Sequence, residues 1–137
     1  AIDLGSEGRR LNASELENMY RLKTGLLLHT SVVSAAICSG ADETTIASFS
    51  TFIDSLGLAF QIRDDILDIE GETEIIGKQQ GADIERDKAT YPAMFGLDQA
   101  HARVTELLDE ALAALAHFGT RAESLAWLAR YIAARDH

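Results

Sequence analysis

One long helical stretch decides the fold of this chain: residues 43–69 read ETTIASFSTFIDSLGLAFQIRDDILDI. Asp42 stands just before it, and aspartate caps helices because its side chain accepts a backbone N–H of the first turn. Apolar side chains recur at intervals of three and four residues, as they do on the buried side of a helix. That side is expected to contain Ile46, Phe49, Phe52, Ile53, Leu56, Phe60 and Leu67. We therefore predict a helix over 43–69 with a broad apolar face.

A second helix is predicted ahead of this stretch, over residues 14–39. Ser14 and Glu17 have the spacing of a capping box, and Gly40 stands where a helix C-terminus favours glycine. The stripe of this helix contains Leu16, Met19, Tyr20, Lys23, Leu26, Leu27, Val32 and Ile37. Gly25 interrupts the helix at a cost of about 1 kcal/mol relative to alanine, which indicates a packing or access reason.

Helices are also predicted in the second half of the chain. Thr90 caps a short helix with Pro92 in its first turn, and Asp98 opens a helix over 99–118 that ends at Gly119. Thr120 and Glu123 form a second capping box, which opens a last helix to about residue 134. Between the two halves, residues 70–89 lose the apolar periodicity and are predicted to form a charged loop.

Composition agrees with long helices. The 137 residues include one proline, where average usage would give roughly seven. Proline breaks helix interiors, and no alternation of period two predicts a strand. We therefore expect an all-α fold, an antiparallel helical bundle in which residues 1–137 belong to one domain.

Charge and cysteine content exclude several classes. The net charge of −10 argues against nucleic-acid binding through the overall field. No run of about 18 uninterrupted apolar residues predicts a membrane span. The single Cys38 excludes an intramolecular disulfide, fits a reducing compartment such as the cytoplasm, and is expected to be a small buried side chain.

The acidic side chains near the end of the long helical stretch point to a cation site. Asp64 and Asp68 stand four residues apart, so they share one helix face. Oxygen ligands at this spacing suit Mg²⁺, which keeps several waters and bridges to substrate phosphates. From the acids alone, a solvated helix face and a magnesium site both remain open. An EF-hand is excluded, because Ile66 falls where that loop needs an oxygen ligand.

The lysines favour the magnesium site. The chain has nine arginines and three lysines, and an ammonium group is a compact charge suited to phosphate. Lys23 precedes Thr24 and Gly25, while Lys78 and Lys88 follow the acids, in or beside the predicted loop. Each lysine alone is compatible with an ordinary surface residue. Together with the acids they indicate a ligand that is a magnesium diphosphate.

Five motifs in this order resemble the trans-prenyl diphosphate synthases, and among them the bacterial farnesyl diphosphate synthase (geranyltranstransferase) type. They are Asp3-Leu4, Lys23-Thr24-Gly25, Phe-Gln-Ile-Arg-Asp-Asp-Ile-Leu-Asp at 60–68, Gly-Lys-Gln-Gln-Gly-Ala-Asp at 77–83 and Lys-Ala-Thr-Tyr-Pro at 88–92. The 60–68 segment corresponds to the second aspartate-rich motif of that family. The resemblance covers essentially the whole chain.

The resemblance implies a fold, a reaction and a set of site residues. The fold is a helical bundle around a central cavity, and the reaction joins an allylic diphosphate to isopentenyl diphosphate with Mg²⁺ as cofactor. The implied metal ligands are Asp64, Asp65 and Asp68, with Asp64 the direct one. The implied diphosphate-binding residues are Lys23, Thr24, Gln61, Lys78 and Lys88. Of these, Lys23, Thr24 and Gln61 are the implied catalytic residues, and Arg130 and Arg135 are weighed as a basic cover for the diphosphate.

The chain departs from that family in one respect: the Asp-Asp pair at 64–65 is the single one in the sequence, so the first aspartate-rich motif is absent. We therefore expect the C-terminal half of a synthase, inactive alone, whose partner is the missing N-terminal half. Exposed apolar faces on such a half also predict a homo-oligomer. Two alternatives are kept: a non-catalytic helical subunit or diphosphate-binding module, and a terpene cyclase, which the intact aspartate motif disfavours.

Overall fold

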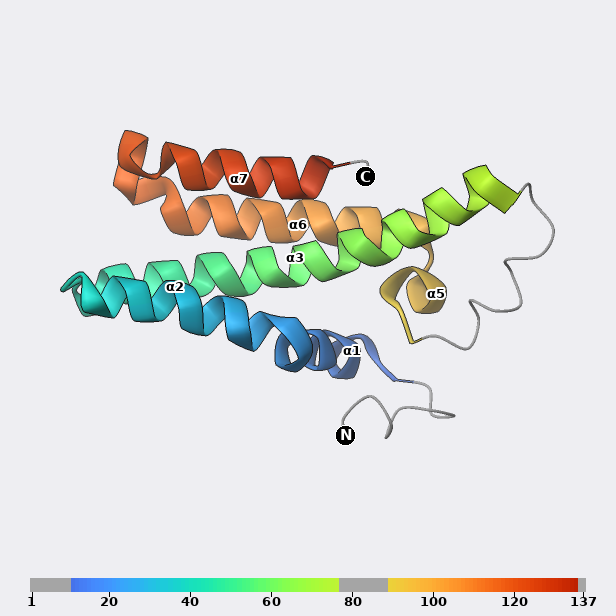
Figure 1. The fold of residues 1–137 in the computed structure, drawn as a ribbon, viewed down its shortest axis with the longest axis horizontal. Helices are drawn as coiled ribbons and strands as arrows, with labels where there is room; N and C mark the ends of the chain where they lie inside the picture. The colour runs from blue at the N-terminus through green and yellow to red at the C-terminus, as the bar shows by residue number, and fades with distance from the viewer. Residues whose placement is uncertain (1–10, 77–88, 136–137) are drawn as a thin grey trace.

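A computed structural model of the chain describes residues 11–76 and 89–135. All the regular elements in these two ranges are helical, which confirms the all-α prediction. The elements in chain order are α1 (Ala13–Tyr20), the π-helical segment η1 (Arg21–Gly25), α2 (Leu26–Cys38), α3 (Glu43–Ile76), α5 (Tyr91–Phe95), α6 (Leu97–Leu115), the 3₁₀ segment η2 (Ala116–Ala122) and α7 (Glu123–Ala134). Figure 1 shows α3 running the length of the molecule between α6 and α7 on one side and α1 and α2 on the other.

The long helix α3 is the centre of the hydrophobic core. At its C-terminal end, Leu58, Ala59, Ile62 and Ile66 pack with side chains of α1, α5 and α6. Toward its N-terminal end, Phe52, Ile53 and Leu56 pack with side chains of α6, η2 and α7. The predicted apolar face is thus confirmed at its centre. The buried surface is wider than predicted, because α3 is covered on two sides and buries Leu58 and Ile62 as well.

Two predicted helix starts are confirmed and three are wrong. Asp42 caps α3 by accepting the N–H of Thr45 at 2.8 Å, and Thr90 caps α5. The first helix is capped by Asn12 rather than Ser14, since Asn12 and Glu15 form the reciprocal capping box. Asparagine is among the strongest N-caps, and a start at Ala13 buries Leu16 and Met19. In the second half, the N-caps are Gly96 in place of Asp98 and Ala122 in place of Thr120.

The predicted helix ends also change. The helix that contains the acids continues to Ile76, so the predicted loop is wrong for residues 70–76. Gly71 lies within it, and apart from its own helix no described atom would lie within 4 Å of an added Cβ there. The helix predicted over 99–118 ends at Leu115 and tightens into η2, where Gly119 has a φ of +59°. Gly40 ends α2 as predicted, with a φ of +73°.

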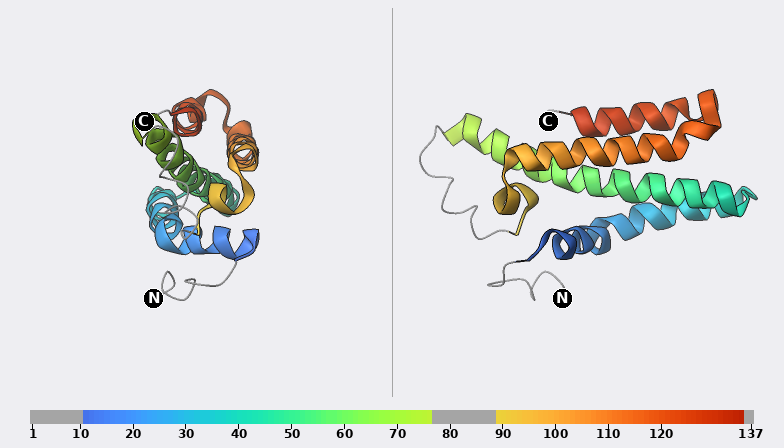
Figure 2. Two further views of the ribbon diagram at one scale, coloured as in Figure 1. Left: turned by 90° about the vertical axis from the view of Figure 1, so that its right-hand side faces the viewer. Right: turned by 180° about the vertical axis from the view of Figure 1, so that it is seen from behind.

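The apolar stripe predicted over 14–39 is buried only at its start. Leu16, Met19 and Tyr20 are buried, whereas Leu26 and Leu27 of α2 are 59% and 73% exposed. Cys38 is exposed as well, so its predicted burial is wrong. The physical reason is the π-helical segment η1, which changes the register between α1 and α2. The views in Figure 2 show α1 turned across the direction of α2.

By length and composition alone, the Glu43–Gly71 part of α3 is suited to crossing a membrane, although no such segment was expected from the sequence. The core helix of a helical bundle has the same length and apolar composition. In the structure, α3 packs against α2, α6 and α7.

Two glycines allow the arm formed by α1, η1 and α2 to approach α3. A Cβ placed on Gly57 would lie 3.4 Å from Cδ1 of Leu28 and 3.8 Å from Cα of Gly25. Alanine would therefore fit at position 57, but a longer side chain would not. This contact gives Gly25 the packing role that its position in a helix indicates.

We predict that Gly57→Leu lowers the free energy of unfolding by about 2 kcal/mol, because overpacking a close contact forces neighbouring atoms apart. Gly71→Leu is the matched control, since an added Cβ meets no atom within 4 Å there. It should leave the free energy of unfolding unchanged or raise it by up to about 0.8 kcal/mol through helix propensity. Urea unfolding of both variants measures the difference, and equal effects would contradict the proposed contact.

Candidate functional site

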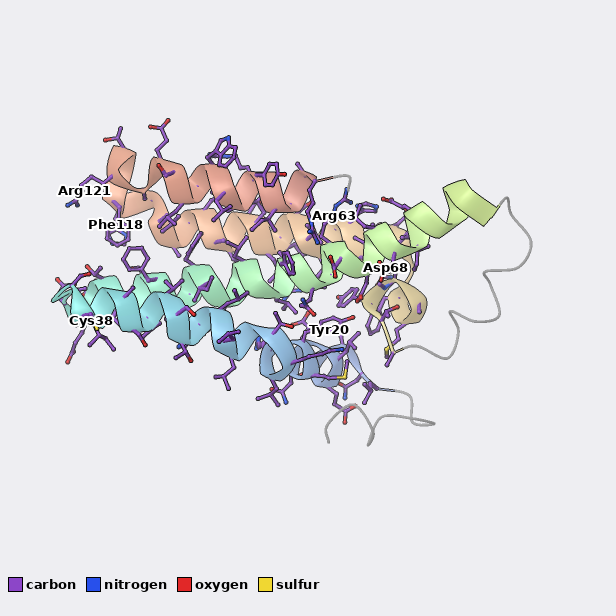
Figure 3. All side chains as sticks on the ribbon, viewed as in Figure 1. Tyr20, Cys38, Arg63, Asp68, Phe118 and Arg121 are labelled. Carbon is purple, nitrogen blue, oxygen red and sulfur yellow. The ribbon has the colours of Figure 1, made fainter. Side chains whose placement is uncertain are left out.

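The three aspartates on α3 have different surroundings. Asp64 and Asp68 are exposed, whereas Asp65 is half-buried and accepts a hydrogen bond from Tyr20. The Asp64 carboxylate lies 2.5 Å from a guanidinium nitrogen of Arg135. In Figure 3, Tyr20, Arg63 and Asp68 lie in the half of the molecule away from Phe118 and Arg121.

The hydroxyl of Tyr20 is the junction of three elements. It donates to Oδ2 of Asp65 on α3 and accepts the backbone N–H of Tyr91, the first residue of α5, at 3.0 Å. Tyr20 itself is the last residue of α1 and is buried. Burial raises the pKa of the Tyr20 hydroxyl well above its usual range, and the hydrogen bond to Asp65 adds to this effect. The hydroxyl therefore stays protonated and donates.

The pKa of the Asp65 carboxyl group is shifted by opposing effects. Burial raises the pKa of its carboxyl group, and the hydrogen bond from Tyr20 lowers it. The negative charges of Asp68 and Asp64 raise the pKa further, so its net shift is upward. The protein environment therefore makes Asp65 a less readily ionised acid than an exposed aspartate.

The other predicted site residues that the structure describes lie near this junction. Lys23 is exposed and Thr24 half-buried in η1, which packs against α3. Gln61 is half-buried on α3, one turn before Asp64 and Asp65. Segments of π-helix inside α-helices are frequent at functional sites, and η1 contains two of the three predicted catalytic residues. Lys78 and Lys88 lie outside the described residues.

Two arginines join the end of α7 to the acidic segment. Arg63 is buried, and its Nε and Nη2 donate to the backbone oxygen of Arg135 at 2.8 Å and 2.6 Å. The guanidinium of Arg135 also lies over the Phe60 ring, 4.5 Å from its centroid. Its Nε is buried and has no hydrogen-bond partner among the described residues. Arg135 is thus paired with the acid Asp64, whereas Arg130 is exposed on α7. The basic cover for a diphosphate that was considered from the sequence stays a prediction.

The aspartates of α3 can hold Mg²⁺ only if a bound ligand supplies further oxygen atoms. Within residues 11–76 and 89–135, no three histidine, cysteine or acidic side chains are placed to hold a metal by themselves. Mg²⁺ is commonly held by one or two carboxylates together with waters and substrate phosphates. Asp64 and Asp68 are exposed carboxylates one helical turn apart and meet that requirement, although Asp64 is paired with Arg135 and would exchange that partner for the cation. Asp65 is half-buried and engaged by Tyr20.

Tyr20, Tyr91 and Arg63 have roles in the structure that are not predicted from the sequence. Tyr20 was assigned to the apolar stripe, but a buried tyrosine needs a partner for its hydroxyl, and that need was the available signal. Arg63 offers a similar signal, because a charged side chain between the buried Ile62 and Ile66 must find an acceptor. In both cases the partner is distant in sequence, by 45 and 72 residues.

We predict that Arg63→Met lowers the free energy of unfolding by about 2 kcal/mol, because it removes two charge-assisted hydrogen bonds to one carbonyl. Amide hydrogen exchange in the last turn of α7 should become faster in this variant. Arg121→Met, at an exposed position of η2, is the control and should change neither quantity. Unchanged exchange at the end of α7 in Arg63→Met would contradict the role assigned to this contact.

Comparison with known proteins places this geometry in a family. The family model described as polyprenyl synthetase matches residues 1–126. The chain is 44% identical over 137 residues to farnesyl diphosphate synthase of Geobacillus stearothermophilus, covering 100% of this chain and 46% of that protein. It is 39% identical over 140 residues to farnesyl diphosphate synthase of Escherichia coli K12, covering 99% and 47%.

Solved structures agree with the sequence comparisons. A putative farnesyl-diphosphate synthase from Marinomonas sp. MED121 superposes with a TM-score of 0.78 at 36% identity, covering 96% of this chain and 44% of that one. An FPP/GFPP synthase from Zymomonas mobilis gives a TM-score of 0.77 at 32% identity, covering 96% and 42%. The chain thus spans less than half the length of these relatives. Its motifs, its helical fold and these matches together show that the chain belongs to the polyprenyl synthetase family.

Proposed function

We propose that this chain supplies the part of a prenyltransferase that binds a magnesium diphosphate, in a reaction that joins an allylic diphosphate to isopentenyl diphosphate. The observation that carries the proposal is the exposed Asp64–Asp68 face of α3, with the Lys23–Thr24 segment packed against the same helix. The names of the relatives, farnesyl diphosphate synthases, support the same reaction class. Formation of farnesyl diphosphate is the specific reaction we propose.

Each side chain has a distinct task in this proposal. Asp64 and Asp68 would hold Mg²⁺, which when bound draws negative charge from the leaving diphosphate. Lys23 offers a positive charge to the diphosphate oxygens. Thr24 and Gln61 line the adjoining surface with a hydroxyl and an amide that orient the ligand. Fixed charges directed at developing negative charge are the main source of rate enhancement in such sites.

The alternatives are less well supported. A non-catalytic subunit that only binds a partner protein would have no need of Asp64, Asp68 and Lys23 together, whereas a diphosphate-binding module would share them and differs from a synthase by lacking turnover. A terpene cyclase would carry an Asn/Ser/Glu metal motif where this chain has Asp64, Asp65 and Asp68. The family model and the relatives' names also favour a synthase.

The exposed apolar side chains of the arm offer a surface for the rest of the enzyme. Leu22, Leu26, Leu27 and Ile37 are each at least 46% exposed. The chain matches 46% of the Geobacillus relative, so that relative has further residues of its own to cover such a face. We propose that an N-terminal half with the first aspartate motif packs here, and that the chain by itself associates into a homo-oligomer through the same side chains.

We predict that the chain alone, given geranyl and isopentenyl diphosphates with Mg²⁺, forms no farnesyl product. Co-expression with the part of the Geobacillus relative that this chain does not match should restore product, because the two parts would complete the site. Chromatography of the products tests both expectations, for the chain alone and for the co-expressed pair. Turnover by the chain alone above a blank would contradict the division of the site into two halves.

We further predict that Asp64→Asn weakens the binding of Mg²⁺ together with pyrophosphate by at least about tenfold, since metal affinity falls by 10–100-fold even when groups around a ligand are removed. Asp109→Asn, at an exposed position of α6, is the matched control and should bind as the unaltered chain does. Isothermal calorimetry measures both. Equal affinities would refute the metal role of Asp64.

A further inference from the structure

The Tyr20 hydroxyl both donates and accepts a hydrogen bond, and these two bonds join α1, α3 and α5. Its one proton goes to Asp65, and an oxygen lone pair accepts the N–H of Tyr91. The ring is buried among Leu16, Met19 and Ile62 in the same core cluster. The hydroxyl therefore has a fixed position and a fixed direction.

The elements that meet at this hydroxyl include those that present the candidate ligand-binding side chains. Lys23 and Thr24 follow Tyr20 by three and four residues, within η1. Asp64 and Asp68 flank Asp65 on α3. A bond from Tyr20 to Asp65 thus fixes the rotation of the acidic face relative to the segment with the candidate lysine.

We propose that Tyr20 is a positioning residue: its hydroxyl holds the Asp65 carboxylate against α1, so that Asp64 and Asp68 are the carboxylates that remain to bind the cation. The inference deepens the proposed function and rests on it for the identity of the ligand. It assigns to Asp65 the role of an acceptor within the protein. Asp65 thereby differs from Asp64 and Asp68, which are exposed.

Geometry favours this role over simple core filling. A residue that only filled the core would be replaceable by phenylalanine without loss, because the ring supplies the packing. Here the hydroxyl is the sole side-chain group shown to bridge α1, α3 and α5 among the described residues. Asp65 is half-buried beneath it, so a carboxylate without this donor would be poorly solvated.

The test is a set of four variants of the full chain: Tyr20→Phe, Asp65→Ala, Asp65→Asn and the double variant Tyr20→Phe with Asp65→Ala. The probe is Mg²⁺ with inorganic pyrophosphate, measured by calorimetry. Tyr20→Phe should weaken binding by about tenfold, as expected for loss of a hydrogen bond to a charged group. Asp65→Ala should weaken it equally, and the double variant should bind no more weakly than either single variant, because both changes remove one interaction.

Asp65→Asn separates positioning from metal ligation. Its amide oxygen can still accept the Tyr20 proton, so binding should stay within about twofold of that of the unaltered chain. A metal ligand would lose affinity on this change as Asp64→Asn does. If Asp65→Asn binds as weakly as Asp65→Ala, the positioning role is overturned in favour of ligation.

Met19→Ala controls for general loss of stability. Met19 is buried in the same cluster next to Tyr20, and its truncation leaves the hydroxyl contacts in place. It should lower the melting temperature without weakening Mg²⁺–pyrophosphate binding. Amide exchange at Tyr91 gives a readout without ligand, and it should become faster in Tyr20→Phe but not in Met19→Ala.

The outcomes separate the two proposals. If the unaltered chain binds Mg²⁺ and pyrophosphate and Tyr20→Phe binds equally well, the positioning role fails and the proposed function stands. If the unaltered chain does not bind the probe, the proposed function fails and the positioning role fails with it. If Tyr20→Phe does not fold, the comparison of Asp65→Ala with Asp65→Asn decides the matter.

Discussion

The structure depends on one constraint: α3 has to be the central core helix and also present charged side chains. Ile62 and Ile66 are fully buried, while Asp64 and Asp68, two residues further on in each case, are exposed. A helical period of 3.6 residues puts these pairs on nearly opposite sides. The aliphatic side then anchors α1, α5 and α6, and those elements in turn hold the acidic side in place. Stability and site geometry therefore share the same few turns of helix.

This constraint explains why the arm formed by α1, η1 and α2 is irregular. The arm must lie close to α3 at Gly25 and Gly57, and it must also reach Asp65 with the Tyr20 hydroxyl. A straight helix over 13–38 keeps one register along its whole length, whereas the π-helical segment η1 changes the register between these contacts. The cost is the exposure of Leu26 and Leu27, which a continuous stripe would have buried.

The parts predicted from the sequence are those that local patterns determine. Apolar periodicity identified α3 and the all-α class, and single capping residues identified the starts of α3 and α5. The two capping-box predictions failed because Asn12 lay beside Ser14 as a competing cap and because η2 occupied the residues around Thr120. The acids and Lys23 were identified by motif, but Tyr20, Arg63 and their partners were not. Those contacts connect residues 45 and 72 positions apart, and such pairings arise from tertiary packing.

The link between α7 and the acids has an electrostatic consequence for the proposed function. The chain carries a net charge of −10, and Arg135 supplies a positive charge at 2.5 Å from the Asp64 carboxylate. Arg63 donates two hydrogen bonds to the backbone oxygen of Arg135. These bonds, as well as the ion pair with Asp64, hold the Arg135 guanidinium in place. A cation that binds Asp64 must therefore compete with Arg135. By linkage, a change at the end of α7 that weakens that ion pair and leaves Asp64 intact strengthens cation binding, so the end of α7 and the metal site are thermodynamically coupled.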